Sequence, residues 1–318
     1  MKQTLLIGST VIDIIITLPA LPRKGEDVNI KPPIHRLGGC AYNVFETLRF
    51  LNSPAMLCSP VGTGVYGHMV QDQMAKIGIK PLANIDEDNG CCYCLIEEDG
   101  ERSFLSCHGA EYFFFRSWMK GMDIAESDSI YISGIDLEVP TGDEIVRFIY
   151  EHPDRSLYFS PGPRIMHIEH SRLAKIFQHR DKNNKGPLLH LNEREALWYT
   201  KKNNVKSAAA VLYMLTNNAV VITLGERGCY CFDQTTDKSG KFLPGYPAKI
   251  VDTTGAGDVH LGAVITGLKN GNSLEKSCEA ANLIGAAACG MHGCVFTDHP
   301  DADRLRAEIF GAFGKPGL

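Results

Sequence analysis

Short apolar runs of strand length alternate with longer segments of helical spacing along most of the chain. Strands are predicted at residues 3–7, 56–61, 128–133, 157–159, 188–191, 219–223 and 229–232. Segments with helical spacing are found at residues 44–51, 68–77, 259–268 and 279–289. This alternation is typical of a mainly parallel central sheet with helices on both faces, so the pattern predicts an α/β fold.

Two stretches differ from this pattern. Residues 27–37 mix apolar with polar positions around Pro32 and Pro33, and residues 91–109 read as a hairpin turning at Asp99-Gly100. We expect both stretches to form a small β-sheet lid inserted in a single domain that spans residues 1–318. Because an exposed sheet edge has to be covered, a homodimer through this lid is a hypothesis.

The apolar N-terminus resembles a signal peptide, since Lys2 precedes a run that extends to Leu18. Asp13 interrupts the run, however, and no small-x-small cleavage site follows it, so we expect a strand there and a cytoplasmic protein. No uncharged apolar run reaches about 18 residues, and no membrane span is expected.

Composition narrows the classes of function. The chain has 318 residues, of which 44% are hydrophobic and 22% charged, as in an ordinary globular protein with a buried core. The net charge of −5 comes without any basic stretch, which argues against a nucleic-acid partner.

The eleven cysteines are interleaved with strand residues or lie in an alanine-rich helical segment. A chain of this length does not need disulfides as staples. Cys91-Cys92-x-Cys94 and Cys229-x-Cys231 would each supply half of a metal site. Because no two C-x-x-C motifs with zinc spacing are present, buried reduced thiols are the favoured interpretation.

The sequence D-T-T-G-A-G-D at residues 252–258 carries the strongest chemical signal. Gly255 and Gly257 precede a helical segment, where free N–H groups and the helix dipole favour an anion. A carboxylate at Asp258 would be repelled by a phosphate bound there. Its position is explained if Asp258 takes the proton of a hydroxyl that attacks phosphorus, although a simple helix cap is the alternative.

A second glycine turn, Gly38-Gly39, also precedes a helical segment and is followed by Asn43, which offers both a donor and an acceptor to a hydroxyl. Asp13 follows the first predicted strand among apolar neighbours. We expect it to be partly buried and to accept hydrogen bonds from sugar hydroxyls.

Three motifs, D-T-T-G-A-G-D, G-G-x-x-x-N and the N-x-x-E formed by Asn192 and Glu195, occur in the order of the ribokinase-like (PfkB) family of carbohydrate and nucleoside kinases. The chain resembles that family over residues 3–297. The resemblance implies a ribokinase-like three-layer α/β/α fold. It also implies that the protein uses ATP and Mg²⁺. Thr63 and Ser160 replace residues that are acidic in many relatives, which suggests a branch other than standard ribokinases or fructokinases.

The resemblance also implies a role for individual residues. Asp258 would be the base, and the anion hole would be formed by the amides of Gly255, Ala256 and Gly257. The acceptor would be held by Asp13, Gly38, Gly39, Asn43, Glu138 and Arg164. ATP would contact Asn192, Thr223, Gly225, Gly228 and Asn282. Glu195 would hold Mg²⁺ through water, and the loop at Gly293 corresponds to a place where some relatives bind a monovalent cation such as K⁺.

His260 stands where most relatives have phenylalanine. It is either a variant packing residue or a residue that senses the substrate side, and packing is the favoured interpretation.

The expected function is transfer of the γ-phosphate of ATP to a hydroxymethyl group of a ribose-like or fructose-like sugar. Alternatives are a nucleoside or pseudouridine kinase, or a non-catalytic sugar-binding regulator with the same fold. A dinucleotide-dependent oxidoreductase is disfavoured because Gly8-Ser9-Thr10 does not supply G-x-G-x-x-G after the first strand.

Overall fold

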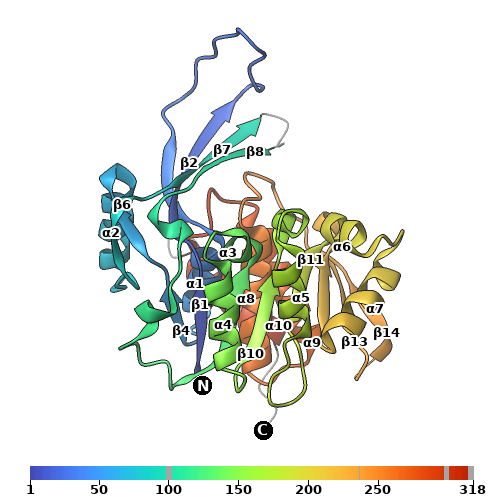
Figure 1. Cartoon of the computed structure of the whole chain (residues 1–318). Coiled ribbons are helices and arrows are strands. Elements are labelled where there is room, and N and C mark those ends of the chain that lie inside the picture. The colour runs from blue at the N-terminus through green and yellow to red at the C-terminus, as the bar shows by residue number, and fades with distance from the viewer. Residues whose placement is uncertain (98–101, 236, 297–300, 314–318) are drawn as a thin grey trace.

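The computed structural model describes residues 1–97, 102–235, 237–296 and 301–313. Its largest element is an eight-stranded sheet (Figure 1). The strands are β1 (Gln3–Ile7), β4 (Ala55–Cys58), β9 (Ser127–Ser133), β10 (Ser156–Ser160), β11 (Leu188–Asn192), β12 (Val220–Thr223), β13 (Cys229–Asp233) and β14 (Asp237–Leu243). Their order is β14-β13-β12-β11-β10-β9-β1-β4. The six strands from β12 to β4 are parallel, and β13 and β14 are antiparallel, which confirms a mainly parallel sheet.

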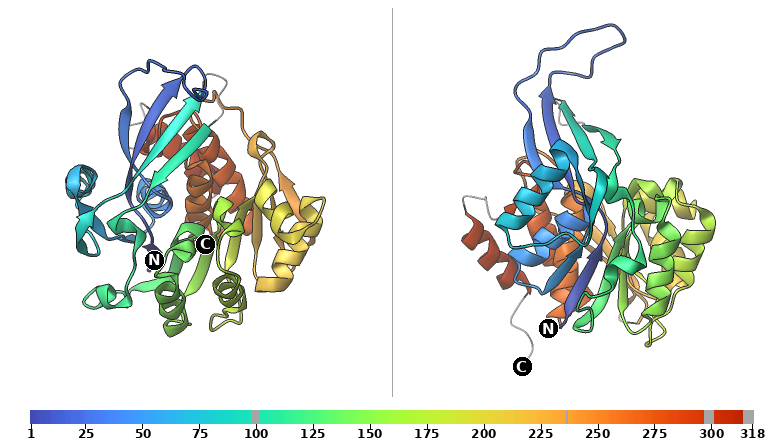
Figure 2. Two further views of the ribbon diagram at one scale, coloured as in Figure 1. Left: turned by 45° about the horizontal axis from the view of Figure 1, so that its top comes forward. Right: turned by 60° about the vertical axis from the view of Figure 1, so that its left-hand side comes forward.

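Helices cover both faces of this sheet, and the right-hand view of Figure 2 shows the resulting three layers. One layer contains α1 (Cys40–Phe50), α8 (Ala256–Lys269), α9 (Leu274–Ala288) and α10 (Ala302–Phe313). The other contains α3 (Gly134–Glu138), α4 (Gly142–Glu151), α5 (His170–Gln178), α6 (Glu193–Thr200) and α7 (Val205–Thr216).

Alternating residues of the central strands enter two separate cores. In β9, Ile130 and Ile132 pack with the layer of α4 and α5, whereas Tyr131 packs with the layer of α1 and α8. All three side chains are buried. A parallel strand that is buried on both faces reads as a continuous apolar run, which explains why sequence alone located these strands.

A second sheet projects beyond one end of the main sheet (Figure 1). It has the order β3-β2-β7-β8 and is called here the lid sheet. Its strands are β2 (Val11–Leu18), β3 (Ile34–Gly38), β7 (Cys91–Glu97) and β8 (Arg102–Cys107). Beside it lie α2 (Gly64–Lys76) and a two-stranded sheet of β5 (Val61–Thr63) and β6 (Asn84–Asp88).

The lid sheet differs in part from the prediction over residues 27–37 and 91–109. Residues 27–33 form no strand, because Pro32 and Pro33 cannot donate to a ladder, and β3 begins only at Ile34. The apolar segment Val11–Leu18 instead supplies a central strand of this sheet. Both strands of the expected hairpin are present, whereas its Asp99-Gly100 turn lies outside the described residues.

The chain enters and leaves the lid sheet through short, glycine-containing crossings. β1 leads through Gly8 into β2, and β3 leads through Gly39 into α1. Gly90 and Gly109 flank the hairpin of β7 and β8, and the buried carboxylate of Glu111 accepts hydrogen bonds from both of their backbone N–H groups (2.6 and 3.1 Å). One side chain thus ties together the two ends of the hairpin.

Within the described ranges, no helix is both long enough and apolar enough to cross a bilayer.

Candidate active site

A cavity of about 440 Å³ lies between the carboxyl ends of the parallel strands and the lid sheet. The core contributes residues that follow β1, β9, β10 and β11, together with the N-terminus of α8. The lid sheet contributes residues of β2, β7 and β8. Ligands of open α/β sheets bind at this carboxyl edge, so the cavity is the candidate active site.

The two glycine motifs of the sequence meet in this cavity. Asp258 lies in the first turn of α8, and its Oδ2 accepts a hydrogen bond of 3.0 Å from Nδ2 of Asn43 in α1. Gly255 caps α8 with a positive φ of 72°. A Cβ at Gly255 would lie 2.5 Å from Cys294 Sγ and 2.8 Å from Asn43 Nδ2, so glycine is required for this contact.

Burial raises the pKa of Asp258 from 3.8 to about 7, against the hydrogen bonds from Asn43 and Cys40, which lower it. A carboxyl group that titrates near neutrality holds a proton more strongly than an ordinary aspartate. This property suits a general base at neutral pH.

The space in front of the α8 N-terminus is open and polar. A Cβ at Gly257 would have no neighbouring atom within 4 Å. Thr253 and Thr254 line the cavity, and their hydroxyl oxygens are buried without a hydrogen-bond partner among the described residues. Free hydroxyls and a helix N-terminus fit an anion such as a phosphate group.

Asp13 reaches the same cavity from β2 of the lid sheet and is buried. Burial is the largest cause that raises the pKa of Asp13, followed by the charges of Cys92, Asp252 and Asp258. A Cβ at Gly38 would lie 2.0 Å from Asp13 Oδ2, so the glycine leaves room for this carboxylate.

Gly39 and Asn43 line the same cavity as Asp13. Gly38 lies outside this lining and packs directly against the Asp13 carboxylate. The structure therefore brings Asp13, Gly39 and Asn43, three of the residues predicted for the acceptor, into one cavity.

Arg164 and Glu138 form an ion pair, with 3.0 Å between Arg164 Nη1 and Glu138 Oε2. Arg164 lines the cavity but Glu138 does not. Glu138 stands at the end of α3, which begins with a capping box between Ser133 and Asp136. Glu138 thus contacts the site through Arg164.

Asn192 and Glu195 form the predicted capping box at the start of α6. Asn192 Oδ1 accepts from the Glu195 N–H at 2.9 Å, and the Asn192 N–H donates to Glu195 Oε2 at 3.0 Å. Both residues line the cavity together with Thr223. Burial raises the pKa of Glu195. An oxygen ligand at the cavity wall fits Mg²⁺, which keeps most of its waters and uses few protein carboxylates.

Gly225 and Gly228 lie in the turn after β12, outside the lining of the cavity, and both have positive φ angles of 64° and 91°. A Cβ at Gly228 would lie 2.1 Å from the Leu243 carbonyl oxygen. These glycines shape the turn next to Thr223, and their contact with ATP stays a prediction.

Asn282 is buried in α9, does not line the cavity and has its side chain engaged within the protein. Its Nδ2 donates to the carbonyls of Leu243 (3.3 Å) and Pro244 (3.0 Å), and its Oδ1 is 3.1 Å from His260 Nε2. His260 Nδ1 in turn lies 3.0 Å from His190 Nε2. The carbonyl contacts fix Oδ1 of Asn282 as an acceptor, so His260 Nε2 is the donor.

His190 is a cavity residue that sequence reasoning missed. It stands two positions before Asn192 on β11, so strand alternation directs both side chains to the same face, and this spacing was the available signal. Burial, followed by the neighbouring His260, lowers the pKa of His190. The neutral form therefore dominates at pH 7. His260 is buried, as a packing residue would be. It also makes hydrogen bonds to His190 and Asn282, which the sequence did not predict.

All eleven cysteines are free thiols, as the sequence indicated, but not all are buried, since Cys107 is exposed. The cavity is lined by Cys40, Cys91, Cys92, Cys94 and Cys107. A hydrogen bond from Cys94 is the largest cause that lowers the pKa of Cys92, to about 7.

Comparison with known proteins agrees with this geometry. A family model described as pfkB family carbohydrate kinase matches residues 1–151 and 172–301. The chain is 33% identical over 297 residues to a protein of Escherichia coli K12 named uncharacterized sugar kinase YegV, an alignment that covers 92% of this chain and 90% of the relative.

Solved structures share the fold. A ribokinase from Thermotoga maritima has a TM-score of 0.78 at 20% identity and covers 99% of this chain and 100% of its own. A nucleoside kinase from Burkholderia thailandensis in complex with inosine also has a TM-score of 0.78, at 19% identity, and covers 98% of this chain and 99% of its own. Kinases of this family use ATP and Mg²⁺ and act on sugars or nucleosides. With the ribokinase-like fold and the matching family model together, the chain belongs to the pfkB family of carbohydrate kinases and is a phosphotransferase that acts on a hydroxyl acceptor.

Proposed function

We propose that the protein transfers the γ-phosphate of ATP to a hydroxymethyl group of a ribose-like or fructose-like sugar. The observation that carries the proposal is the contact between Asn43 and Asp258 at the α8 N-terminus, inside a cavity that Asp13 enters from the lid sheet. Base, anion-binding end of a helix and acceptor ligand thus share one enclosed space.

The reaction follows from this arrangement. As the acceptor oxygen bonds to the γ-phosphorus, Asp258 accepts the proton of that hydroxyl. The bond from the γ-phosphorus to its bridging oxygen breaks, and ADP leaves with the bonding electrons. The amides of Gly255, Ala256 and Gly257 stabilise the negative charge on the transferred group.

The acceptor is held from two sides. Asp13 and Asn43 bind its hydroxyls, with Gly39 allowing close approach and Gly38 making room for Asp13. Arg164, oriented by Glu138, contacts the acceptor or the phosphates at the cavity wall. Closure of the lid sheet over the acceptor would exclude water, which otherwise competes for the phosphoryl group.

The nucleotide lies along the other wall of the cavity in this proposal. Asn192, Thr223, Gly225 and Gly228 face its phosphates and ribose. Asn282 acts on its base through the loop carbonyls of Leu243 and Pro244 that it holds. Glu195 holds Mg²⁺ through water, and the ion supplies positive charge against the phosphates.

A nucleoside is the second candidate acceptor, since Phe104 and His108 line the cavity and His108 stacks on Tyr112 with 3.9 Å between the ring centroids. Aromatic surfaces in a nucleoside site would stack against a base. Phe104→Ala should therefore raise the KM of a nucleoside acceptor strongly and that of a free sugar little.

The test is ADP release from Mg·ATP across a panel of pentoses, hexoses and nucleosides including pseudouridine. We expect one group of acceptors to give turnover that Asp258→Asn lowers at least about 100-fold, with ATP binding by calorimetry unchanged. Asp72→Asn, which alters an exposed carboxylate in α2, is the matched control. Turnover of Asp258→Asn close to that of the wild type would refute the base assignment.

Two further properties are proposed for the site and its surroundings. A monovalent cation would bind at the loop of Gly293, whose N–H donates to Asp252. Turnover should then be higher in K⁺ than in a bulky organic cation.

A dimer would form through the lid sheet, whose residues Ile34, Phe104 and Leu105 are exposed, and light scattering would report twice the chain mass.

A further inference from the structure

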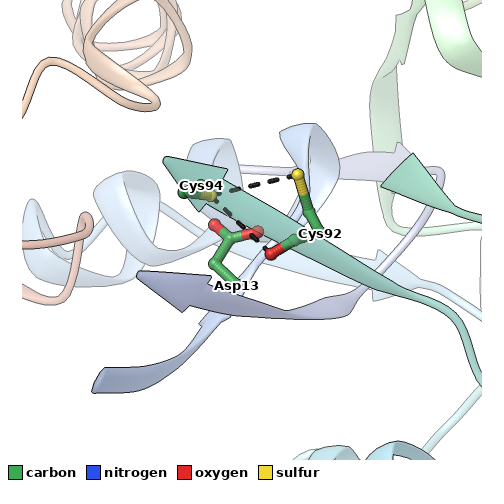
Figure 3. A group of neighbouring side chains, drawn as sticks. All are labelled: Asp13, Cys92 and Cys94. Atoms are coloured by element: carbon green, nitrogen blue, oxygen red, sulfur yellow. Dashed lines mark hydrogen bonds between the residues drawn. The ribbon is translucent and has the colours of Figure 1, made fainter. Parts of the chain in front are cut away.

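We propose that Asp13, Cys92 and Cys94 form a binding site for a soft divalent cation such as Zn²⁺, and that a metal bound there excludes the acceptor. The three residues lie on adjacent strands of the lid sheet (Figure 3). The second half of the proposal rests on the proposed function, because it takes Asp13 as an acceptor ligand.

Strand register brings the three side chains to one face. β2 and β7 are parallel, and Asp13 pairs directly with Cys92. Cys94 follows two positions after Cys92, so their side chains point to the same side of the strand. Figure 3 shows the two thiols and the carboxylate converging from these two strands.

The distances suit a tetrahedral metal. One ligand atom of each residue lies within 4.8 Å of the other two, and Cys92 Sγ is 3.9 Å from Cys94 Sγ. Two thiolates on one Zn²⁺, with Zn–S bonds of about 2.3 Å, stand about 3.8 Å apart. The strands therefore need no rearrangement to bring both sulfurs to one ion.

The type of ligand selects the type of metal. Two sulfurs and one oxygen favour Zn²⁺ or Cd²⁺, whereas Mg²⁺ prefers oxygen and water. The proposed Mg²⁺ residue, Glu195, offers only oxygen. Zn²⁺ and Mg²⁺ would thus bind to different residues of one cavity, because they prefer different ligand atoms.

The cluster has access to solvent and a mixed charge around it. All three residues line the cavity, which leaves the fourth position of a tetrahedral ion open to water. The negative charges of Asp252 and Asp258 act on Asp13, and the positive charge of Arg164 acts on Cys92. Without a metal, the Cys94 thiol donates weakly to the Cys92 carbonyl oxygen at 3.8 Å.

Direct binding tests the site on the full chain without an activity assay. Co²⁺ is the probe, because tetrahedral thiolate coordination gives sulfur-to-cobalt charge-transfer bands. We expect the wild type to show these bands at one equivalent of Co²⁺. Cys92→Ala and Cys94→Ala should each lose the bands and bind at least about tenfold more weakly.

Cys107→Ser is the matched control, since it removes an exposed thiol that lines the same cavity from the adjacent strand but is not part of the cluster. ATP binding by calorimetry shows that each variant is folded. Absence of charge-transfer bands in the wild type, or bands that persist in both alanine variants, would overturn the site.

Inhibition tests the second half. With saturating Mg·ATP, Zn²⁺ should raise the KM of the acceptor and leave kcat unchanged. Each alanine variant, compared with its own metal-free rate, should need at least about tenfold more Zn²⁺ for the same effect. Zn²⁺ that binds through the two cysteines but competes with ATP would overturn the exclusion of the acceptor while leaving the metal site intact.

Discussion

Asn43 donates its side-chain amide to the carboxylate of Asp258 at 3.0 Å, although 215 positions separate the two residues in the chain. The contact joins the first helix of the core to the helix that carries the proposed base. Among the hydrogen bonds to Asp258, the one from Asn43 lowers the pKa of the carboxyl group most.

Asn43→Ala should therefore move the pH dependence of turnover. The hydrogen bond from Asn43 lowers the pKa of Asp258, so its loss raises that pKa above about 7. Because the base must be ionised, the acidic limb of the pH–rate profile should shift to higher pH. Turnover at pH 7 should fall about 10- to 100-fold. A profile with lower turnover but an unmoved acidic limb would show that Asn43 acts only on the acceptor.

Asp258→Asn should stabilise the protein without ligands at alkaline pH. Because burial raises the pKa of Asp258 to about 7, the folded protein holds this proton up to that pH, whereas the unfolded chain releases it near pH 4. The free energy of unfolding then falls as the pH rises from about 4 through 7, and the full loss is present above.

Urea unfolding at pH 8 should show the asparagine variant more stable by about 2–4 kcal/mol, with the difference shrinking toward pH 5. Equal stability of the two proteins at pH 8 would mean that other interactions in the folded state offset the cost of burying the ionised Asp258 carboxylate.

Two neighbouring glycines should respond differently to alanine. Gly255→Ala places a methyl group against Cys294 and Asn43 at a positive φ, and should destabilise the protein by more than about 1 kcal/mol. Gly257→Ala meets no atom within 4 Å and should leave stability unchanged or slightly raised.

Both changes should lower phosphoryl transfer, the second because its methyl group enters the space proposed for the transferred phosphate. Thermal unfolding together with ADP release separates the two effects. If Gly257→Ala kept wild-type turnover, the transferred phosphate would not occupy the space beside Gly257.

The pair of His190 and His260 should show strong energetic coupling. His260→Phe leaves the buried ring N–H of His190 without a partner, at a cost of about 1–3 kcal/mol. His190→Leu removes that group, so the double variant should be more stable than the sum of the two single changes predicts. Denaturant titrations of the four proteins measure the coupling, and strict additivity would contradict it.

Sequence predicted the features that depend on local chemistry. The glycines at the start of α8 and the capping box of Asn192 with Glu195 are encoded within a few residues, and both features are present. Apolar runs likewise located the core strands, because those strands are buried on both faces.

Features that depend on tertiary pairing were not predictable in the same way. Val11–Leu18 reads as a strand whichever sheet it joins, and only the structure assigns it to the lid sheet. The approach of Asp13 to Cys92 depends on the register of β2 and β7. Asn282 stands away from the cavity because its amide is held by Leu243 and Pro244.

The lid sheet is joined to the rest of the chain at four glycine-containing crossings, so its segments could be exchanged as units between relatives. Residues 9–38 and 90–109 carry Asp13 and the two thiols, whereas Asn43, Asp258 and the α8 N-terminus remain in the core. The part of the proposed acceptor site that Asp13 contributes therefore lies in two segments joined to the core at Glu111 and the glycines, whereas Gly39, Asn43 and Arg164 belong to the core. A chimera that takes these two segments from a relative should shift its acceptor preference toward that of the relative, with the phosphoryl-transfer centre unchanged.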